Sequence, residues 1–254
     1  MDTGFINGVL FLDLKKAFDT VDHQIMIRKL YLYGIKEVAL TWFTSYLNKR
    51  TQVCKVNNTI SSSKPISCGV PQGSNLGPLL FLLCINDLPK CLKSSAPAMY
   101  ADDAIITICG KTGEEIEKQL NSERENVVHK LLLVNKLTLN VDKTEYMIIG
   151  SRQRITKITD ACNLKIDIGG KDVKGVTSTK SLGVIIDDNL CWKEQVDGIS
   201  TNVSRAIGIT RRAKPFIKKK SLQLMYQSLI LPYLSYCSLV WGNYKFFSLE
   251  QREL

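Results

Sequence analysis

The sequence contains very little histidine and no closely spaced cysteines. Only two histidines, His23 and His129, occur among the 254 residues, which disfavours imidazole-rich metal sites and most histidine-dependent nucleophile triads. The eight cysteines form no CxxC pair, which argues against a zinc site and, since no secretory signal is apparent, against a disulfide framework. Acid or metal chemistry in this chain must therefore rest on carboxylates.

Long hydrophobic runs and a secretory signal are also missing. The longest apolar runs, 76–85 and 229–241, are interrupted or too short to cross a bilayer. The N-terminus lacks a basic region followed by an apolar core and a small-residue cleavage site. We therefore expect a soluble, intracellular protein without a signal peptide or transmembrane segment.

The composition is that of a globular, basic protein. The chain is 44% hydrophobic and 8% aromatic, which is enough to build one large core or two smaller ones. Lys and Arg outnumber Asp and Glu by 34 to 24, so the net charge is +10 and polyanions should be attracted. The basic clusters at 211–214 and 218–220 suit a surface that follows phosphates, although a solvated helix face explains them equally well.

Hydrophobic periodicity and turn residues predict a mixture of strands and helices. Strands are expected at 9–14, 145–149, 164–168 and 182–186, with a hairpin at 51–68 and a turn at Gly169-Gly170. Helices are expected at 22–33, 37–47, 79–88, 114–135, 193–212 and 219–233, the third of them capped by Ser74 or Asn75.

Two adjacent carboxylates, Asp102 and Asp103, lie between apolar runs that predict the strands of a hairpin. Like charges repel, and a divalent cation is the simplest compensation, although a solvated turn would also explain the pair. Asp13 closes another apolar strand, so three carboxylates could meet at the ends of adjacent strands. Such a cluster suits two magnesium ions about 3.5 to 4 Å apart, which promote in-line phosphoryl displacement.

Five segments in order carry a family resemblance. They read FLDLKKAFDTVDH at 11–23, GVPQGSNLGPLLF at 69–81, YADD at 100–103, LTLNVDKT at 137–144 and SLGV at 181–184. Together they resemble the polymerase motifs of reverse transcriptases from non-LTR (LINE-type, jockey-like) retrotransposons. The chance occurrence of all five in this order is negligible.

The resemblance implies an α+β right-hand polymerase fold. A palm, formed by an antiparallel sheet backed by helices and joined to partial fingers, is expected at 1–190, and a partial helical thumb at 191–254. The implied activity is RNA-directed DNA polymerisation, in which two Mg²⁺ ions, or Mn²⁺ in their place, promote transfer from a deoxynucleotide to a primer 3′-hydroxyl. The implied partners are an RNA template, a DNA primer and dNTPs, and the element type suggests a nuclear location.

The resemblance also assigns roles to individual residues. Asp13, Asp102 and Asp103 match the catalytic aspartates that bind the metal ions. The matching nucleotide-binding positions are the Leu14 carbonyl, the Phe18 ring that screens the sugar 2′ position, Gln72 and Gly73 in the loop over the incoming nucleotide, and Lys143, a candidate general acid.

The turn formed by Leu182 and Gly183 resembles the primer grip. Without the motifs, each of these positions would have a plain structural explanation, such as a core phenylalanine or a surface lysine. The helices that follow resemble the thumb, which contacts the template–primer backbone with little sequence readout.

The chain departs from the family pattern at its ends and at two positions. The upstream fingers strands and the endonuclease domain are absent, so we expect an N-terminally truncated fragment. Asn75 occupies a position that is usually apolar in the family, and Leu131 occupies a position where the family often has tryptophan. The alternative hypothesis is a catalytically silent palm and thumb that only binds template–primer; a carboxylate metallohydrolase of another fold would not explain the loop at 71–73.

Overall fold

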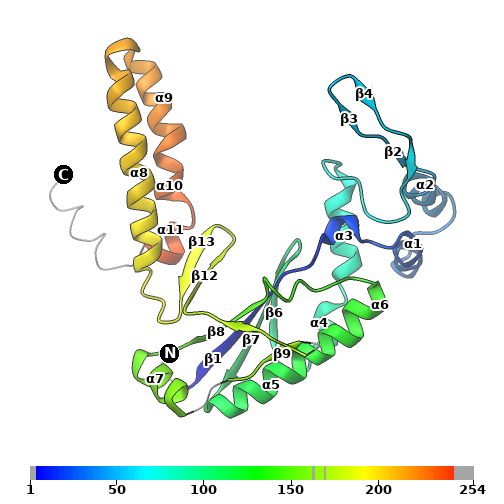
Figure 1. Cartoon of the computed structure of the whole chain (residues 1–254), viewed down its shortest axis with the longest axis horizontal. Helices are drawn as coiled ribbons and strands as arrows, with labels where there is room; N and C mark the ends of the chain where they lie inside the picture. The colour runs from blue at the N-terminus through cyan, green and yellow to red at the C-terminus, as the bar shows by residue number, and fades with distance from the viewer. Residues whose placement is uncertain (1–3, 162–163, 169, 243–254) are drawn as a thin grey trace. The chain divides into compact units, whose positions relative to one another are not determined.

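The computed structural model describes residues 4–161, 164–168 and 170–242 (Figure 1). The chain forms two compact units, Met1–Gly175 and Val176–Leu254. The units divide before the hairpin that contains Leu182, because Val184 of that hairpin packs in one cluster with Ile199 and Trp241. The palm and thumb assignment to 1–190 and 191–254 remains a prediction.

A five-stranded sheet forms the centre of the first unit. Its middle strand, β1, pairs antiparallel with β7 on one side and with β8 on the other. Buried residues of β1 such as Leu10 and Leu12 join the hydrophobic core. The strand order is β11 (Lys174–Gly175), β8 (Glu145–Ile149), β1 (Ile6–Leu12), β7 (Asp103–Gly110) and β6 (Ala96–Tyr100), and only β11 runs parallel to its neighbour.

A long helical segment packs against this sheet (Figure 1). It consists of α5 (Gly113–Asn126), a π-helical stretch (Val127–Leu132) and α6 (Leu133–Asn135), so the helix expected at 114–135 is confirmed. Ile116 and Leu120 of α5 are buried, and a Cβ on Gly8 of β1 would lie 2.4 Å from Ile116 Cγ2. The glycine therefore allows the helix to approach the middle strand closely.

A buried carboxylate ties this helix to the chain segment that leads into β6. Glu123 of α5 accepts hydrogen bonds from the backbone N–H groups of Lys93 and Ser94 and from the Ser94 hydroxyl, at 2.6 to 3.1 Å. Burial raises the pKa of Glu123, but these hydrogen bonds outweigh burial and hold the pKa below its ordinary value. The ionised carboxylate therefore stabilises the entry to the β6–β7 hairpin.

The remaining helices of the first unit largely follow the predicted pattern. Asp22 caps α1 by accepting from the backbone of Gln24 and Ile25, and Ser74 rather than Asn75 supplies the capping bond of α3, to Gly77 N at 3.0 Å. Lys29 of α1 forms a 2.6 Å ion pair with Asp87, which joins α1 to the turn between α3 and α4. The elements are α1 (His23–Leu32), α2 (Glu37–Leu47), α3 (Leu76–Ile85), α4 (Leu88–Cys91) and α7 (Arg152–Ala161), of which α4 and α7 were not predicted.

The expected hairpin at 51–68 is present as short strand pairs between α2 and α3. Strands β2 (Thr51–Gln52) and β5 (Lys64–Pro65) pair at its base, and β3 (Lys55–Val56) and β4 (Thr59–Ile60) pair near its tip. The strand expected at 164–168 is reduced to β9 (Asp167–Ile168), which pairs with β10 (Lys171–Asp172). Gly170 has a positive φ of 82° in the turn between them, and Gly169 lies outside the described residues.

The second unit consists of a hairpin followed by helices. The strand expected at 182–186 begins only at Val184, because Leu182 and Gly183 form the turn. The single helix expected at 219–233 is wrong: it ends at Leu229, and a short helix with Pro232 in its first turn follows. The elements are β12 (Ser178–Ser181), β13 (Val184–Asp187), α8 (Lys193–Ala213), α9 (Lys219–Leu229), α10 (Leu231–Ser235) and α11 (Ser238–Trp241).

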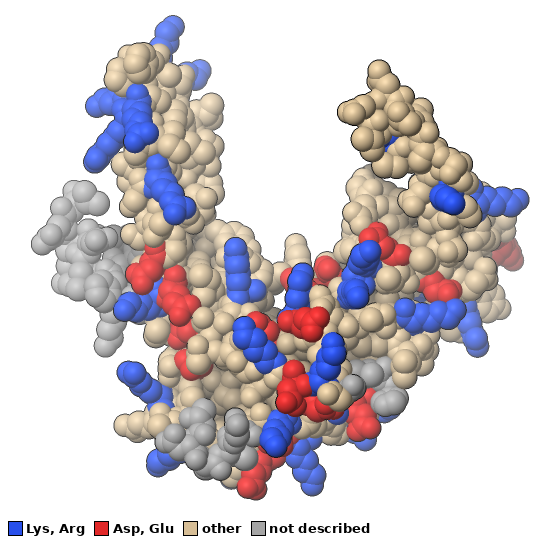
Figure 2. Space-filling view, in the orientation of Figure 1, with Lys and Arg blue, Asp and Glu red and all other residues tan. Residues whose placement is uncertain are grey.

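The helices of the second unit carry a strongly basic surface. Figure 2 shows Lys and Arg side chains along α8 and near the start of α9. No Asp or Glu occurs in the sequence from 198 to 249. Within the described part of the chain, no helix has the length and apolar composition needed to span a membrane.

Candidate active site

Asp13 and Asp103 lie side by side at one end of the central sheet. Leu12, the last residue of β1, pairs with Ala104 of β7. Because the two strands are antiparallel, Asp13, which follows Leu12, lies opposite Asp103, which precedes Ala104. The pairing of the middle strands thus brings together the first and third sequence motifs.

Asp102 occupies the turn of the same hairpin. Tyr100 pairs with Asp103, so the two-residue turn between β6 and β7 consists of Ala101 and Asp102. Ala101 has a positive φ of 53° and Asp102 does not have a positive φ, which is the pattern of a type II′ hairpin turn. The hairpin predicted from sequence is confirmed, with Asp103 as the first residue of its second strand rather than part of the turn.

The like charges of this cluster perturb one of its members. Desolvation raises the pKa of Asp103 above its ordinary value, and the negative charges of Asp102 and Asp13 raise it further. Asp103 is nonetheless exposed and the other two aspartates are half-buried. No Lys or Arg is among the groups that shift the pKa of Asp103, and a bound cation would supply the compensating positive charge.

The fourth motif lies against the first. Asn140 Nδ2 donates to Asp13 Oδ2 at 2.8 Å, and Asn140 N donates to the Asp13 carbonyl at 2.8 Å. Leu14 forms a β-bridge with Leu139, and Lys15 N donates to Thr138 O at 2.8 Å. These bonds fix the backbone that follows β1, so Asn140 orients the Asp13 carboxylate while Lys143 lies exposed in the adjoining turn.

The donor set fits a hard divalent cation in its chemistry. Mg²⁺ prefers carboxylate and phosphate oxygens, and Asp13, Asp102 and Asp103 offer carboxylates from adjacent strands of one sheet. Among the described residues, however, no three His, Cys, Asp or Glu side chains are grouped closely enough to hold a metal ion. The assignment of Asp13, Asp102 and Asp103 as metal ligands therefore stays a prediction.

The glycine loop of the second motif is bonded to the segment after Asp13. Gly69 N donates to Val21 O and Val70 N donates to Phe18 O, both at 2.8 Å. The buried His23 forms a 2.7 Å hydrogen bond between Nε2 and Gly69 O. Because a carbonyl only accepts, His23 carries its proton on Nε2 in this contact.

Gln72 and Phe18, two of the nucleotide-binding positions expected from the sequence, connect the first motif with the second. Gln72 Nε2 donates to Asp19 Oδ1 at 2.8 Å, and Gly73 follows with a positive φ of 74°. Phe18 is half-buried, and its ring centroid lies 4.6 Å from that of Phe81 on α3. The first and second motifs are therefore held together by backbone, amide and aromatic contacts.

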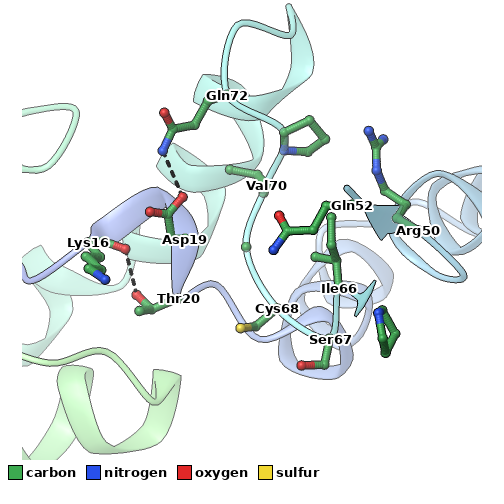
Figure 3. A pocket seen from close by; sticks show the side chains of 13 residues that line it. Lys16, Asp19, Thr20, Arg50, Gln52, Ile66, Ser67, Cys68, Val70 and Gln72 are labelled. Atoms are coloured by element: carbon green, nitrogen blue, oxygen red, sulfur yellow. Dashed lines mark hydrogen bonds between the residues drawn. The ribbon is translucent and has the colours of Figure 1, made fainter. Parts of the chain in front are cut away.

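A cavity of about 650 Å³ opens beside this junction (Figure 3). Its wall combines two cations, Lys16 and Arg50, with the amides of Gln52 and Gln72 and the carboxylate of Asp19. The lining residues are Lys16, Asp19, Thr20, Arg50, Gln52, Pro65, Ile66, Ser67, Cys68, Gly69, Val70, Pro71 and Gln72.

Leu182 and Gly183 lie in the second unit, in the turn between β12 and β13. Both have positive φ, 47° and 84°. Tyr236 of the helical segment donates its hydroxyl proton to Leu182 O at 2.6 Å, and a Cβ on Gly183 would lie 3.4 Å from the Tyr236 ring. Tyr236 thus supports the turn that the sequence assigns to the primer grip.

Three supporting residues were missed by sequence reasoning. His23 and Asn140 lie within the first and fourth motifs, so their position in the sequence could have indicated them. Tyr236 lies outside all five motifs, and only the folded second unit reveals its contact with Leu182.

A central antiparallel sheet that carries aspartates at one end, with helices packed against it, is the architecture of a polymerase palm. The model of the family "Reverse transcriptase (RNA-dependent DNA polymerase)" matches residues 4–186. The chain belongs to the reverse transcriptase family. The resemblance to reverse transcriptases of non-LTR retrotransposons and the expected α+β palm fold with a helical region are thereby confirmed.

The curated relatives are polymerases of mobile elements. The chain is 25% identical over 248 residues to the probable RNA-directed DNA polymerase from transposon X-element of Drosophila melanogaster, which covers 92% of this chain and 25% of that relative. It is 26% identical over 246 residues to the RNA-directed DNA polymerase from mobile element jockey of the same organism, with 91% and 25% coverage. The chain thus spans about a quarter of the length of these relatives.

Solved structures of telomerase show a more distant similarity. Apo telomerase from Candida tropicalis, truncated from its C-terminal domain, is 13% identical with a TM-score of 0.48, over 72% of this chain and 34% of that one.

Proposed function

We propose that this chain acts as an RNA-directed DNA polymerase of a non-LTR retrotransposon. It would extend a DNA primer on an RNA template by transferring nucleotides from dNTPs to the primer 3′-hydroxyl. The observation that carries the proposal is the β1–β7 register, which brings Asp13 opposite Asp103 with Asp102 in the adjoining turn. Family membership supports the same activity.

We further propose that Asp13, Asp102 and Asp103 bind two Mg²⁺ ions, for which Mn²⁺ could substitute. When bound, such ions activate the attacking hydroxyl and stabilise the charge of the leaving pyrophosphate. The raised pKa of Asp103 supports this assignment, since an unneutralised carboxylate cluster favours a cation. The Asn140 amide would hold the Asp13 carboxylate in position, because it already donates to Oδ2.

The nucleotide would lie between the first and second motifs. Phe18 is proposed to exclude the 2′-hydroxyl of a ribonucleotide, and its packing against Phe81 would keep the ring rigid. Gln72 and Gly73 are proposed to contact the incoming nucleotide, with the Leu14 carbonyl near the metal ions. Lys143 is exposed and is proposed as the general acid that protonates the departing pyrophosphate.

The second unit is proposed to hold the template–primer duplex. The region from 198 to 249 has basic residues and no acidic ones, which favours contact with phosphates rather than with base edges. Leu182 and Gly183 are proposed as the primer grip, with their turn supported by Tyr236.

A primer-extension assay tests the proposal. The protein is incubated with an RNA template, an annealed DNA primer, the four dNTPs and Mg²⁺, and elongated primers are resolved on a gel. Extension is expected with the wild-type chain, and its loss is expected on chelation of the metal and in the double variant Asp102→Asn, Asp103→Asn. The matched control is Asp172→Asn, which alters an exposed aspartate of β10 and should extend normally.

Two results would contradict the proposal. One is no extension by the folded wild-type chain at high protein and dNTP concentrations. The other is extension by the double variant at the wild-type rate, because the aspartates would then have no part in the reaction.

A further inference from the structure

An aromatic and cationic ladder lies on helix α2 and the residues that follow it. The ring planes of Trp42 and Tyr46 are 10° apart with centroids at 5.5 Å, so the two rings are stacked. The guanidinium of Arg50 lies 5.5 Å from the Tyr46 centroid and continues the stack as a cation–π contact. We name Trp42, Tyr46 and Arg50 the α2 ladder.

The ladder is preorganised and open to solvent at its outer end. Residues four apart share one face of a helix, which aligns Trp42 with Tyr46. Phe43 meets the indole edge-on at 5.1 Å and restrains it, whereas 51% of Trp42 remains exposed. A large aromatic side chain is thus held in a fixed orientation without being buried in the core.

The inner end of the ladder reaches the cavity beside the second motif. Arg50 stacks on Tyr46 and also lines the 650 Å³ cavity, whose wall includes Lys16 and Gln72 (Figure 3). Asp19 is the acidic residue of this wall, and it accepts a hydrogen bond from Gln72. A path therefore runs from an exposed indole past a cation to a cavity with two positive side chains.

We propose that the α2 ladder binds an unpaired nucleic-acid strand by stacking a base on Trp42, while Arg50 and Lys16 contact its phosphates. Stacking on an aromatic side chain requires a base face that is free, which an unpaired strand offers and a duplex does not. Cations beside the aromatic rings complement the phosphate backbone. The proposal deepens the proposed function, because the strand would be the template before it pairs.

Val38 allows an experiment to distinguish a nucleic-acid strand from a protein partner on this face of α2. Val38 lies one turn before Trp42 on the same face of α2 and is 83% exposed. An apolar protein surface that covers this face would contact Val38 as well as Trp42. Tyr46 covers one face of the indole, so a base would stack on the other face and draw its affinity from the ring rather than from the Val38 methyl groups. A Val38→Ala variant is therefore the matched control.

Fluorescence anisotropy with a labelled, unstructured single-stranded RNA tests the proposal. The full chain carries Asp102→Asn and Asp103→Asn in every sample, so that catalysis plays no part in the readout. Trp42→Leu is expected to weaken binding about tenfold, which is within the range for the loss of one stacked base, while Trp42→Phe keeps most of the affinity. Arg50→Gln is expected to reduce the salt dependence by about one released counterion.

Further strands and variants decide the outcome. An abasic strand of the same length should bind the wild-type ladder about as weakly as RNA binds the Trp42→Leu variant, and Val38→Ala should bind RNA like the parent. The proposal is overturned if Trp42→Leu, shown to be folded by circular dichroism, binds RNA as tightly as the parent. An equal loss in Val38→Ala would also overturn it and indicate protein docking on this face.

Two separate measurements, primer extension and RNA binding, distinguish a failure of the proposed function from a failure of the ladder proposal. Loss of primer extension with intact, ladder-dependent RNA binding would contradict only the polymerase activity. Primer extension by a protein whose RNA affinity is unchanged by Trp42→Leu would contradict only the proposal that the α2 ladder binds RNA.

Discussion

Replacing Gly69 with alanine tests how the first motif and the glutamine loop are held together. Gly69 has a φ of 87°, and an added Cβ would lie 2.8 Å from Asp19 O and 3.0 Å from Asp19 C and Cα. All three contacts are with backbone, so the loop must move. The move would weaken the bonds from Gly69 N to Val21 O and from Val70 N to Phe18 O.

Gly73 provides the matched comparison for this substitution. It also has positive φ, 74°, but an added Cβ would meet no atom within 4 Å. Both alanine variants carry the conformational strain of positive φ, about 1–2 kcal/mol. Only Gly69→Ala also weakens two hydrogen bonds worth about 1 kcal/mol each, so we expect it to be less stable than Gly73→Ala by about 2 kcal/mol.

Thermal unfolding followed by circular dichroism measures this difference. For a unit of this size, 1 kcal/mol shifts the melting temperature by roughly 2–4 °C, so Gly69→Ala should melt roughly 4–8 °C below Gly73→Ala. Equal melting temperatures would refute the reasoning, because they would mean that the loop moves away from Asp19 without losing its bonds.

Three further predictions concern individual side chains of the first unit. The lowered pKa of Glu123 means that its contribution to stability is present above its ordinary pKa of 4.5 and is lost as the pH falls below it; urea titrations from pH 7 to 3 should show this loss in the wild type and not in Glu123→Gln. The raised pKa of Asp103 means that its charge is unfavourable in the folded protein, so Asp103→Asn should raise the melting temperature without metal, whereas added Mg²⁺ should stabilise the wild type more than the variant. His23→Phe removes the donor to Gly69 O and should destabilise the chain by about 1–3 kcal/mol, with partial rescue by His23→Gln; unchanged unfolding of the phenylalanine variant would count against this role.

Local sequence signals predicted the elements around the site well. The helix at 37–47 and the strand at 145–149 have the expected bounds, since each combines clear periodicity with nearby turn residues. The Asp102-Asp103 hairpin was predictable for the same reason. The position of Asp13 beside this hairpin was expected because carboxylates adjoin two apolar strands; in the structure Asp13 follows β1 and Asp103 begins β7.

Longer-range effects were not predictable from the same signals. The helix expected at 219–233 divides because Pro232 cannot continue α9, although the apolar pattern runs through the break. The short α4 also carries a proline in its first turn and gave no periodic signal. The bonds of Glu123 with Ser94 and of His23 with Gly69 join distant segments, so no sequence window contains both partners.

The motifs predict which residues form the site, and this assignment stays a prediction. The geometry around these residues was not predictable from the sequence. The motifs indicated Asp13, Asp102 and Asp103, whose strand register the structure then defined. The bond from Asn140 to Asp13 depends on the pairing of the fourth motif with the first. The α2 ladder and Tyr236 lie outside the five motifs. The ladder and the contact of Tyr236 with Leu182 of the fifth motif emerge only from the folded chain.

The most direct test of the central claim is the rate at which the chain adds one deoxynucleotide to a primer as Mg²⁺ is titrated. Wild type, Asp13→Asn, Asp103→Asn and the control Asp172→Asn are compared in single turnovers on the same RNA template. Metal ligation contributes several kcal/mol, so we predict that Asp13→Asn and Asp103→Asn are each slower by about a hundredfold or more, while the control matches wild type. Addition without a divalent cation, or addition by either site variant at the wild-type rate, would contradict the account.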